Sequence, residues 1–206
     1  APCVARADLK LCNRLSYVVE TAIGVEDRGS VRVLTLDNPA KRNALDFGSL
    51  ADLSRACADA GRDRVRCLVV RGAGDQAFSA GFDLDAMDAG DGDRPDLAVE
   101  RAMEALEAVP CPTVAFLNGS AFGGGCELAV TCDLRVARAG VSLGMPPARL
   151  GVVYAAAGLR RFLALIGPSR TQPGHAAPVA GTVPTPAVPS PAATETDGAA
   201  GARDGA

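Results

Sequence analysis

Histidine is almost absent from this chain of 206 residues, which contains a single one, His175. A Ser-His-Asp triad or a histidine-built metal site would have to rest on that residue alone. It stands in a stretch of small residues and prolines, where a solvated side chain is the ordinary outcome. No other cluster of ligand residues has a metal-binding spacing. We therefore expect neither a histidine triad nor a bound metal.

Long apolar runs and clusters of basic residues are missing as well. No window approaches the ~18 apolar residues of a membrane span. No Lys/Arg block accompanies the formal net charge of −3. The N-terminal stretch lacks the apolar segment and the small-residue cleavage pattern of a signal peptide. We expect neither a membrane nor a nucleic acid as a partner.

Cysteine occurs seven times, an odd number, and no two cysteines form a C-x-x-C pair. Most of them stand within apolar runs, where a free thiol behaves as a small hydrophobe. The pattern does not indicate a disulfide framework. We expect a reducing compartment and hence a cytoplasmic location.

Segments typical of strands and helices alternate up to about residue 171. Strands separated by helices imply crossover connections and a largely parallel sheet, so the predicted fold class is α/β. The hydrophobic periodicity predicts strands at 30–37, 65–72 and 112–119, helices at 46–61, 95–109 and 124–133, and two short strands within 134–144.

The composition changes abruptly after residue 171. Of the 35 residues from Gln172 to Ala206, 25 are Ala, Pro, Gly or Thr, and none is Leu, Ile, Phe or Met. Such a segment cannot bury enough apolar surface to offset the entropy lost on ordering. We expect an N-terminal extension at 1–16, one folded domain at 17–171 and a disordered tail at 172–206.

Two glycine-bearing turns each follow a predicted strand. They read "AFSAGFDL" (residues 77–84) and "NGSAFGGGCEL" (residues 118–128). In a parallel sheet both turns would emerge at the carboxyl ends of strands, where α/β proteins bind ligands. A helix that starts in the glycine run points free N–H groups at that crevice, and glycine lets a carbonyl group approach the backbone. One N–H group from each turn could converge on one oxygen as an oxyanion hole; the alternative is a tight strand-to-helix packing turn.

The glycine pattern matches neither G-x-G-x-x-G nor a P-loop. Together with other stretches it resembles the enoyl-CoA hydratase/isomerase (crotonase) superfamily. The resemblance extends from about Tyr17 to Arg170. It rests on four stretches in family order: "LDNPAKRNALD", "AFSAGFDL", "NGSAFGGGCELAVTCDLRVA" and "PPARLGVVYAAAGLRRFLALIGPSR".

The resemblance implies a spiral of β-β-α turns, assembled as a homotrimer or hexamer, that binds an acyl-CoA thioester and stabilises its enolate. Coenzyme A would enter only as part of the substrate, with no separate cofactor. The two oxyanion donors would be the backbone N–H groups of Phe82 and Gly124. Lys41 or Arg42 would lie near a CoA phosphate, or else belong to a solvated charged turn. Further CoA contacts are expected from Ala44, Leu45, Ala80 and Asp83.

Glu127 matches the first of the two glutamates that hydratases use to place and activate water. Its other interpretation is a helix N-terminal carboxylate that the helix dipole favours. The second glutamate is replaced by Pro147, which cannot move a proton. Pro147 followed by Tyr154 resembles the acyl-CoA decarboxylase branch, similar to methylmalonyl-CoA decarboxylase, where a tyrosine and a glutamate frame the departing carboxylate. That branch carries a histidine at the place of Phe82, and Tyr154 could instead be a core residue.

After "GPSR" the resemblance stops, which indicates a shifted reading frame or a truncation of the family's C-terminal helices. Apolar faces such as "LRRFLALIG" should then be exposed and favour association. Three functions follow. The default is an enoyl-CoA hydratase/isomerase. The second is an acyl-CoA decarboxylase that uses Glu127 and Tyr154. The third is a non-catalytic protein that only binds acyl-CoA.

Overall fold

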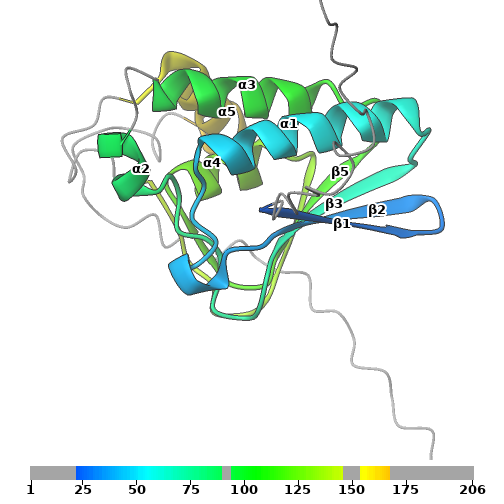
Figure 1. The fold of residues 1–206 in the computed structure, drawn as a ribbon, viewed down its shortest axis with the longest axis horizontal. Coiled ribbons are helices and arrows are strands. Elements are labelled where there is room, and N and C mark those ends of the chain that lie inside the picture. Colours follow the sequence, from blue (N-terminus) through cyan, green and yellow to red (C-terminus); the bar gives the residue numbers. More distant parts are fainter. Residues whose placement is uncertain (1–21, 90–93, 146–153, 168–206) are drawn as a thin grey trace, which may run out of the picture.

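The computed structural model describes residues 22–89, 94–145 and 154–167. The predicted boundaries at 16/17 and 171/172, the tail, His175 and Pro147 lie outside these residues. Within them the chain forms two sheets and a set of helices, drawn in Figure 1. The α/β class is therefore confirmed.

The larger sheet has five strands in the order β1-β2-β3-β5-β7, with β1 antiparallel and the others parallel. Its strands are β1 (Ile23–Arg28), β2 (Val31–Leu36), β3 (Cys67–Gly72), β5 (Thr113–Leu117) and β7 (Leu134–Ala137). The smaller sheet is wholly parallel. Its strands are β4 (Ala77–Ser79), β6 (Ser120–Phe122) and β8 (Leu143–Gly144).

The helices are α1 (Phe47–Arg62), α2 (Leu84–Ala89), α3 (Pro95–Glu107), α4 (Gly124–Thr131) and α5 (Ala156–Ile166), with a 3-10 turn at Pro39–Lys41. From β3 onward, each strand of the larger sheet is followed by a short strand of the smaller sheet and then by helix. This repetition is the β-β-α spiral that the resemblance implied.

One face of the larger sheet carries the core. Alternation along β2 sends Leu34 inward, and the register places it beside Val70 of β3, which in turn neighbours Ala115 of β5. All three side chains are fully buried. In Figure 1, α1 and α3 lie side by side over the sheet, and their apolar faces complete this core.

The start of α1 is fixed by a reciprocal capping box. The Asp46 carboxylate accepts a hydrogen bond from the Ser49 N–H group at 2.7 Å, and the Ser49 hydroxyl accepts one from the Asp46 N–H group at 2.8 Å. These bonds satisfy donors that a helix start leaves without partners. The helix therefore begins within a residue of the sequence prediction.

The smaller sheet corrects one expectation. The two glycine-bearing stretches, 77–84 and 118–128, are not simple turns, because β4 lies within the first and β6 within the second. Three-residue strands are too short to show a hydrophobic period. The helices α2 and α5 and the edge strand β1 were also not predicted; the last four residues of β1 are exposed, so it lacks a buried face to recognise.

Two asparagine side chains, Asn118 and Asn43, bind the chain where β3 ends and β4 begins. Asn118 accepts a hydrogen bond from the Gly72 N–H group at 2.9 Å and donates to the carbonyl oxygens of Gly72 and Gly74. Asn43 donates to the carbonyl oxygens of Ala73 and Ala77. Loops of separate elements are thus fixed against one another by buried amides.

The segment "LRRFLALIG" is only partly exposed. Phe162 of α5 is buried, whereas Leu163 and Leu165 are each 42% exposed. The helix packs mainly against α4. The expected exposure of this segment therefore holds for the outer side of α5 and not for its inner side.

Substitution of Gly125 tests how tightly α4 packs on the smaller sheet. A Cβ atom at this position would lie 2.5 Å from Ser79 Cβ and 2.8 Å from the Ser79 carbonyl oxygen. We expect Gly125→Ala to lower the free energy of unfolding by about 1–3 kcal/mol, despite the better helix propensity of alanine. Urea titration of the chain and its variant measures the difference.

The matched control is Gly48→Ala in the first turn of α1. There the nearest atom to an added Cβ is Asp46 Oδ1 at 3.4 Å. This substitution should leave stability unchanged or raise it by about 0.5–1 kcal/mol. Equal effects of the two substitutions would contradict the packing argument.

Candidate active site

The two glycine-bearing turns meet in space. Gly81 follows β4 with φ +99°, and Gly123 caps α4 with φ +51°. A Cβ on Gly81 would lie 2.8 Å from the Phe122 carbonyl oxygen and 3.3 Å from the Gly124 nitrogen. Both the dihedral angle and this contact exclude a side chain at Gly81.

The backbone nitrogen atoms of Phe82 and Gly124 lie at this junction. A Cβ built on Gly124 would be 3.7 Å from the Phe82 nitrogen. Leu45 donates to the Gly81 carbonyl oxygen at 2.8 Å and accepts from the Asp83 N–H group at 2.7 Å. Alternation along an extended chain therefore points the Phe82 N–H group away from Leu45. Among the described residues, neither the Phe82 nor the Gly124 N–H group donates a hydrogen bond.

Glu127 lies in the first turn of α4 and is 3% exposed. Its Oε2 accepts a hydrogen bond from the Tyr154 hydroxyl group, and its Oε1 accepts one from Arg161 Nη1 at 3.0 Å. Burial raises the pKa of Glu127 above its ordinary value, and the hydrogen bond from Tyr154 and the charge of Arg161 offset part of that rise. The structure thus brings the two predicted catalytic side chains together.

Tyr154 precedes α5 and packs edge-on against Phe162, with ring centroids 6.3 Å apart. Burial raises the pKa of its hydroxyl group, and the neighbouring Glu127 raises it further. Tyr154 therefore remains a neutral donor. Gly158 makes room for the pair, because a Cβ there would lie 2.7 Å from Glu127 Oε1 and would collide with the Tyr154 ring.

Arg161 is a site residue that sequence reasoning missed. Its Nε and Nη2 bind the Glu107 carboxylate of α3 at 2.7 and 3.2 Å, while Nη1 binds Glu127. Its neighbour Arg160 is exposed. In the sequence the two arginines are equivalent, and the helical phase of α5 alone distinguishes them.

The residues expected to contact CoA lie on two segments, 41–45 and 80–83, which pair with each other. Ala80 donates its N–H group to the Arg42 carbonyl oxygen at 2.9 Å, and Leu45 pairs with the segment after Ala80. Lys41 is held in ion pairs with Asp83 at 2.7 Å and with Asp85 at 3.0 Å. Those hydrogen bonds raise the pKa of Lys41 and lower that of Asp83.

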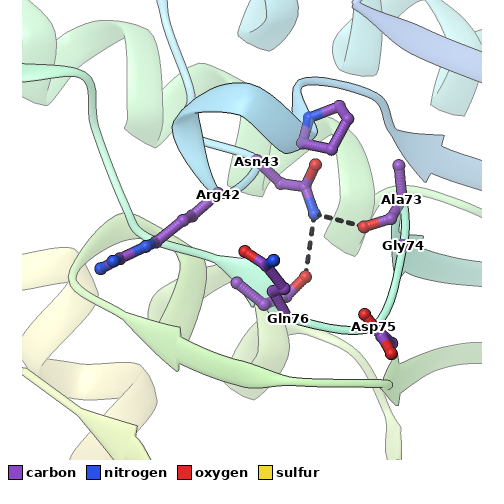
Figure 2. Close-up of a pocket in the computed structure, with 8 residues that line it drawn as sticks. Arg42, Asn43, Ala73, Gly74, Asp75 and Gln76 are labelled. Atoms are coloured by element: carbon purple, nitrogen blue, oxygen red, sulfur yellow. Dashed lines mark hydrogen bonds between the residues drawn. The ribbon is translucent and has the colours of Figure 1, made fainter.

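Arg42 instead borders a cavity of about 130 Å³ beside Asn43. Figure 2 shows Asn43 among the residues that line this cavity, with its side-chain nitrogen bound to the Ala73 carbonyl oxygen. The cavity includes none of the residues Phe82, Gly124 and Glu127. Its lining is Pro39, Arg42, Asn43, Ala73, Gly74, Asp75, Gln76 and Ala77.

Two features are absent from the described residues. No helix in this part of the chain is long and apolar enough to cross a membrane. No group of three or more His, Cys, Asp or Glu side chains there is arranged to hold a metal ion.

Comparison with known proteins agrees with the geometry. The family model described as enoyl-CoA hydratase/isomerase matches residues 26–174. The chain is 35% identical over 151 residues to a crotonyl-CoA hydratase of Syntrophomonas wolfei, covering 70% of this chain and 57% of that protein. It is 31% identical over 147 residues to a short-chain-enoyl-CoA hydratase of Clostridium acetobutylicum, covering 69% and 56%.

A solved structure shows the same relation. The enoyl-CoA hydratase of Bacillus anthracis superposes with a TM-score of 0.68 at 31% identity, over 73% of this chain and 60% of that one. The chain spans little more than half the length of the curated relatives it matches. The match over most of its residues, in sequence and in fold, shows that the chain belongs to the enoyl-CoA hydratase/isomerase family.

Proposed function

We propose that this protein binds an acyl-CoA thioester and stabilises its enolate, as an enoyl-CoA hydratase/isomerase does. The thioester oxygen would accept hydrogen bonds from the backbone N–H groups of Phe82 and Gly124. The observation that carries the proposal is the contact between the two turns, which places both nitrogen atoms at one junction. Preorganised N–H donors of this kind stabilise a developing oxyanion.

Glu127 is the proposed acid/base group. It is buried in the first turn of α4, and Tyr154 and Arg161 each donate a hydrogen bond to one of its two oxygens. Each carboxylate oxygen has a further lone pair that can accept a proton or hold a water molecule. Because both neighbours are donors, the ionised form of Glu127 is the one they favour, and that form can act as a base.

Decarboxylation is the second candidate, favoured by the hydrogen bond between Tyr154 and Glu127. The resemblance implies that this pair frames a departing carboxylate. A non-catalytic acyl-CoA-binding protein is the third. Coenzyme A as part of the substrate, the trimeric or hexameric assembly and the cytoplasmic location stay predictions from the sequence.

Substitution of Glu127 by glutamine tests the acid/base role. We expect Glu127→Gln to lower kcat for crotonyl-CoA hydration by about 10²–10⁴-fold. In the wild type, the rate should fall as the pH drops through the raised pKa of Glu127, because protonation removes the base. The exposed Glu104→Gln on α3 is the control. Unchanged hydration in Glu127→Gln would contradict the acid/base role. A wild type without hydration but with methylmalonyl-CoA decarboxylation that Glu127→Gln lowers would favour the second candidate.

Gly124→Ala tests the oxyanion hole without disturbing the fold. The added methyl group would meet only the Phe82 nitrogen at 3.7 Å and Leu45 Cδ1 at 3.9 Å, which are ordinary contacts. The methyl group would nevertheless occupy the space that a thioester oxygen needs. We expect kcat/KM to fall by about 10²–10³-fold at an unchanged Tm, whereas full activity would show that the oxygen binds elsewhere.

A thermal melt with increasing crotonyl-CoA separates binding from turnover. A ligand that binds only the folded state stabilises it by about 2.7 kcal/mol at a hundredfold excess over Kd. We expect a rise in Tm that depends on ligand concentration. A rise without hydration, isomerisation or decarboxylation would support the non-catalytic candidate, and a flat response would exclude all three.

A further inference from the structure

We propose that Arg161 is a positioning residue, which fixes the carboxylate of Glu127 in the site while Glu107 holds Arg161 in place. This inference deepens the proposed function and rests on its assignment of Glu127. Arg161 itself has no proposed contact with the acyl-CoA.

The geometry of the guanidinium group supports this role. One edge of the fork, Nε and Nη2, binds both oxygens of Glu107 on α3, and Nη1 reaches Glu127 on α4. The Arg161 side chain is 11% exposed, the Glu127 side chain 4% and the Glu107 side chain 47%. A planar fork anchored by two bonds at its outer edge has little freedom at its inner nitrogen.

Three helices are thereby joined at one point. Arg161 lies on α5, Glu127 on α4 and Glu107 on α3, so the position of Glu127 depends on how these helices pack. Tyr154 binds Oε2 and Arg161 binds Oε1. Together the two donors prevent the carboxylate from rotating about its last bond. The lone pairs that remain then point in fixed directions.

The charges facing Glu127 make Arg161 its counter-ion. From α3, Glu100 raises the pKa of Glu127 by its negative charge, and Glu107 lies beyond the guanidinium group. From the α5 side come the neutral Tyr154 and the cation Arg161. Among the described residues, Arg161 is the cation bound to Glu127. Without it, a buried carboxylate near other carboxylates would tend to be neutral.

Lysine cannot reproduce this arrangement. Its ammonium group is a compact charge that would bind one carboxylate well or two poorly, without the planar fork. Arg161→Lys therefore keeps the charge and loses the geometry, and Arg161→Met removes both. Glu107→Gln leaves Arg161 in place and removes its anchor. The exposed Arg160→Met, one residue away on the same helix, is the matched control.

The test combines a direct titration of Glu127 with steady-state kinetics. The ¹³C NMR signal of the Glu127 carboxyl group, assigned by its loss in Glu127→Gln, is followed against pH in the full chain and each variant. kcat and KM for crotonyl-CoA are measured on the same samples. The titration requires no turnover, so it reports on Arg161 independently of the proposed function.

We expect Arg161→Met to move the Glu127 midpoint to higher pH and to lower kcat by about 10–100-fold, since misplacing a reacting group costs that much. KM should stay within about threefold, because uniform substrate binding is untouched. Compared with Arg161→Met, Arg161→Lys should bring the Glu127 midpoint closer to its wild-type value than it brings kcat. Glu107→Gln should lower kcat by less, and Arg160→Met should change neither quantity.

An unchanged midpoint and kcat in Arg161→Met, while Glu127→Gln abolishes turnover, would overturn the positioning role and leave the proposed function standing. A shifted midpoint with no effect of Glu127→Gln on turnover would support the positioning role and overturn the acid/base assignment. If Arg161→Met shows no cooperative melt, the kcat values of Arg161→Lys and Glu107→Gln test the positioning role instead. Wild-type kcat in both would overturn the proposal.

Discussion

The close approach of two backbone turns is the constraint on which the rest of the site depends. Gly81 touches the chain at Phe122 and Gly124 so closely that a single methyl group would separate the turns. Each turn is carried by a short strand of the smaller sheet, and β4 and β6 are paired in parallel. Their pairing sets the distance between the two N–H groups, and the amides of Asn43 and Asn118 hold the loops that lead into β4. The helix α4 can then begin with its free N–H groups at the junction.

Burial of Glu127 is the second constraint, and it opposes stability. A carboxylate removed from water loses solvation that only strong partners can replace. Arg161 and Tyr154 provide two donors, and the half-exposed Glu107 balances the remaining charge of the guanidinium group. This arrangement keeps a titratable group buried three residues from Gly124, one of the two proposed oxyanion donors, and a charge at a buried site has more effect than in water.

The sequence predicted those strands and helices that are long enough to show a hydrophobic periodicity. Alternation in β2 and the amphipathic faces of α1 and α3 were sufficient to predict an α/β chain with a parallel sheet. The glycine run and Glu127 marked one half of the site. Arg161 could not be predicted, because Arg160 is chemically identical and only the rotation of α5 buries one of them. The ion pairs of Lys41 were hidden for a similar reason: Asp83 and Asp85 are distant in sequence and meet it only through the pairing of Leu45 with Phe82.

The two proposed reactions, hydration and decarboxylation, make different demands on the network around Glu127. A hydratase must bind a water molecule and move its proton, so Glu127 needs a free lone pair directed at the substrate and a charge that can be neutralised. Arg161 resists that neutralisation, because it stabilises the ionised form, whereas burial promotes it. A decarboxylase needs no proton at the start. In that proposed reaction, the ionised form of Glu127 beside a neutral Tyr154 would repel the carboxylate of the substrate. Burial and Arg161 therefore act in opposite directions on one carboxylate, and the two proposed reactions need different results of that opposition.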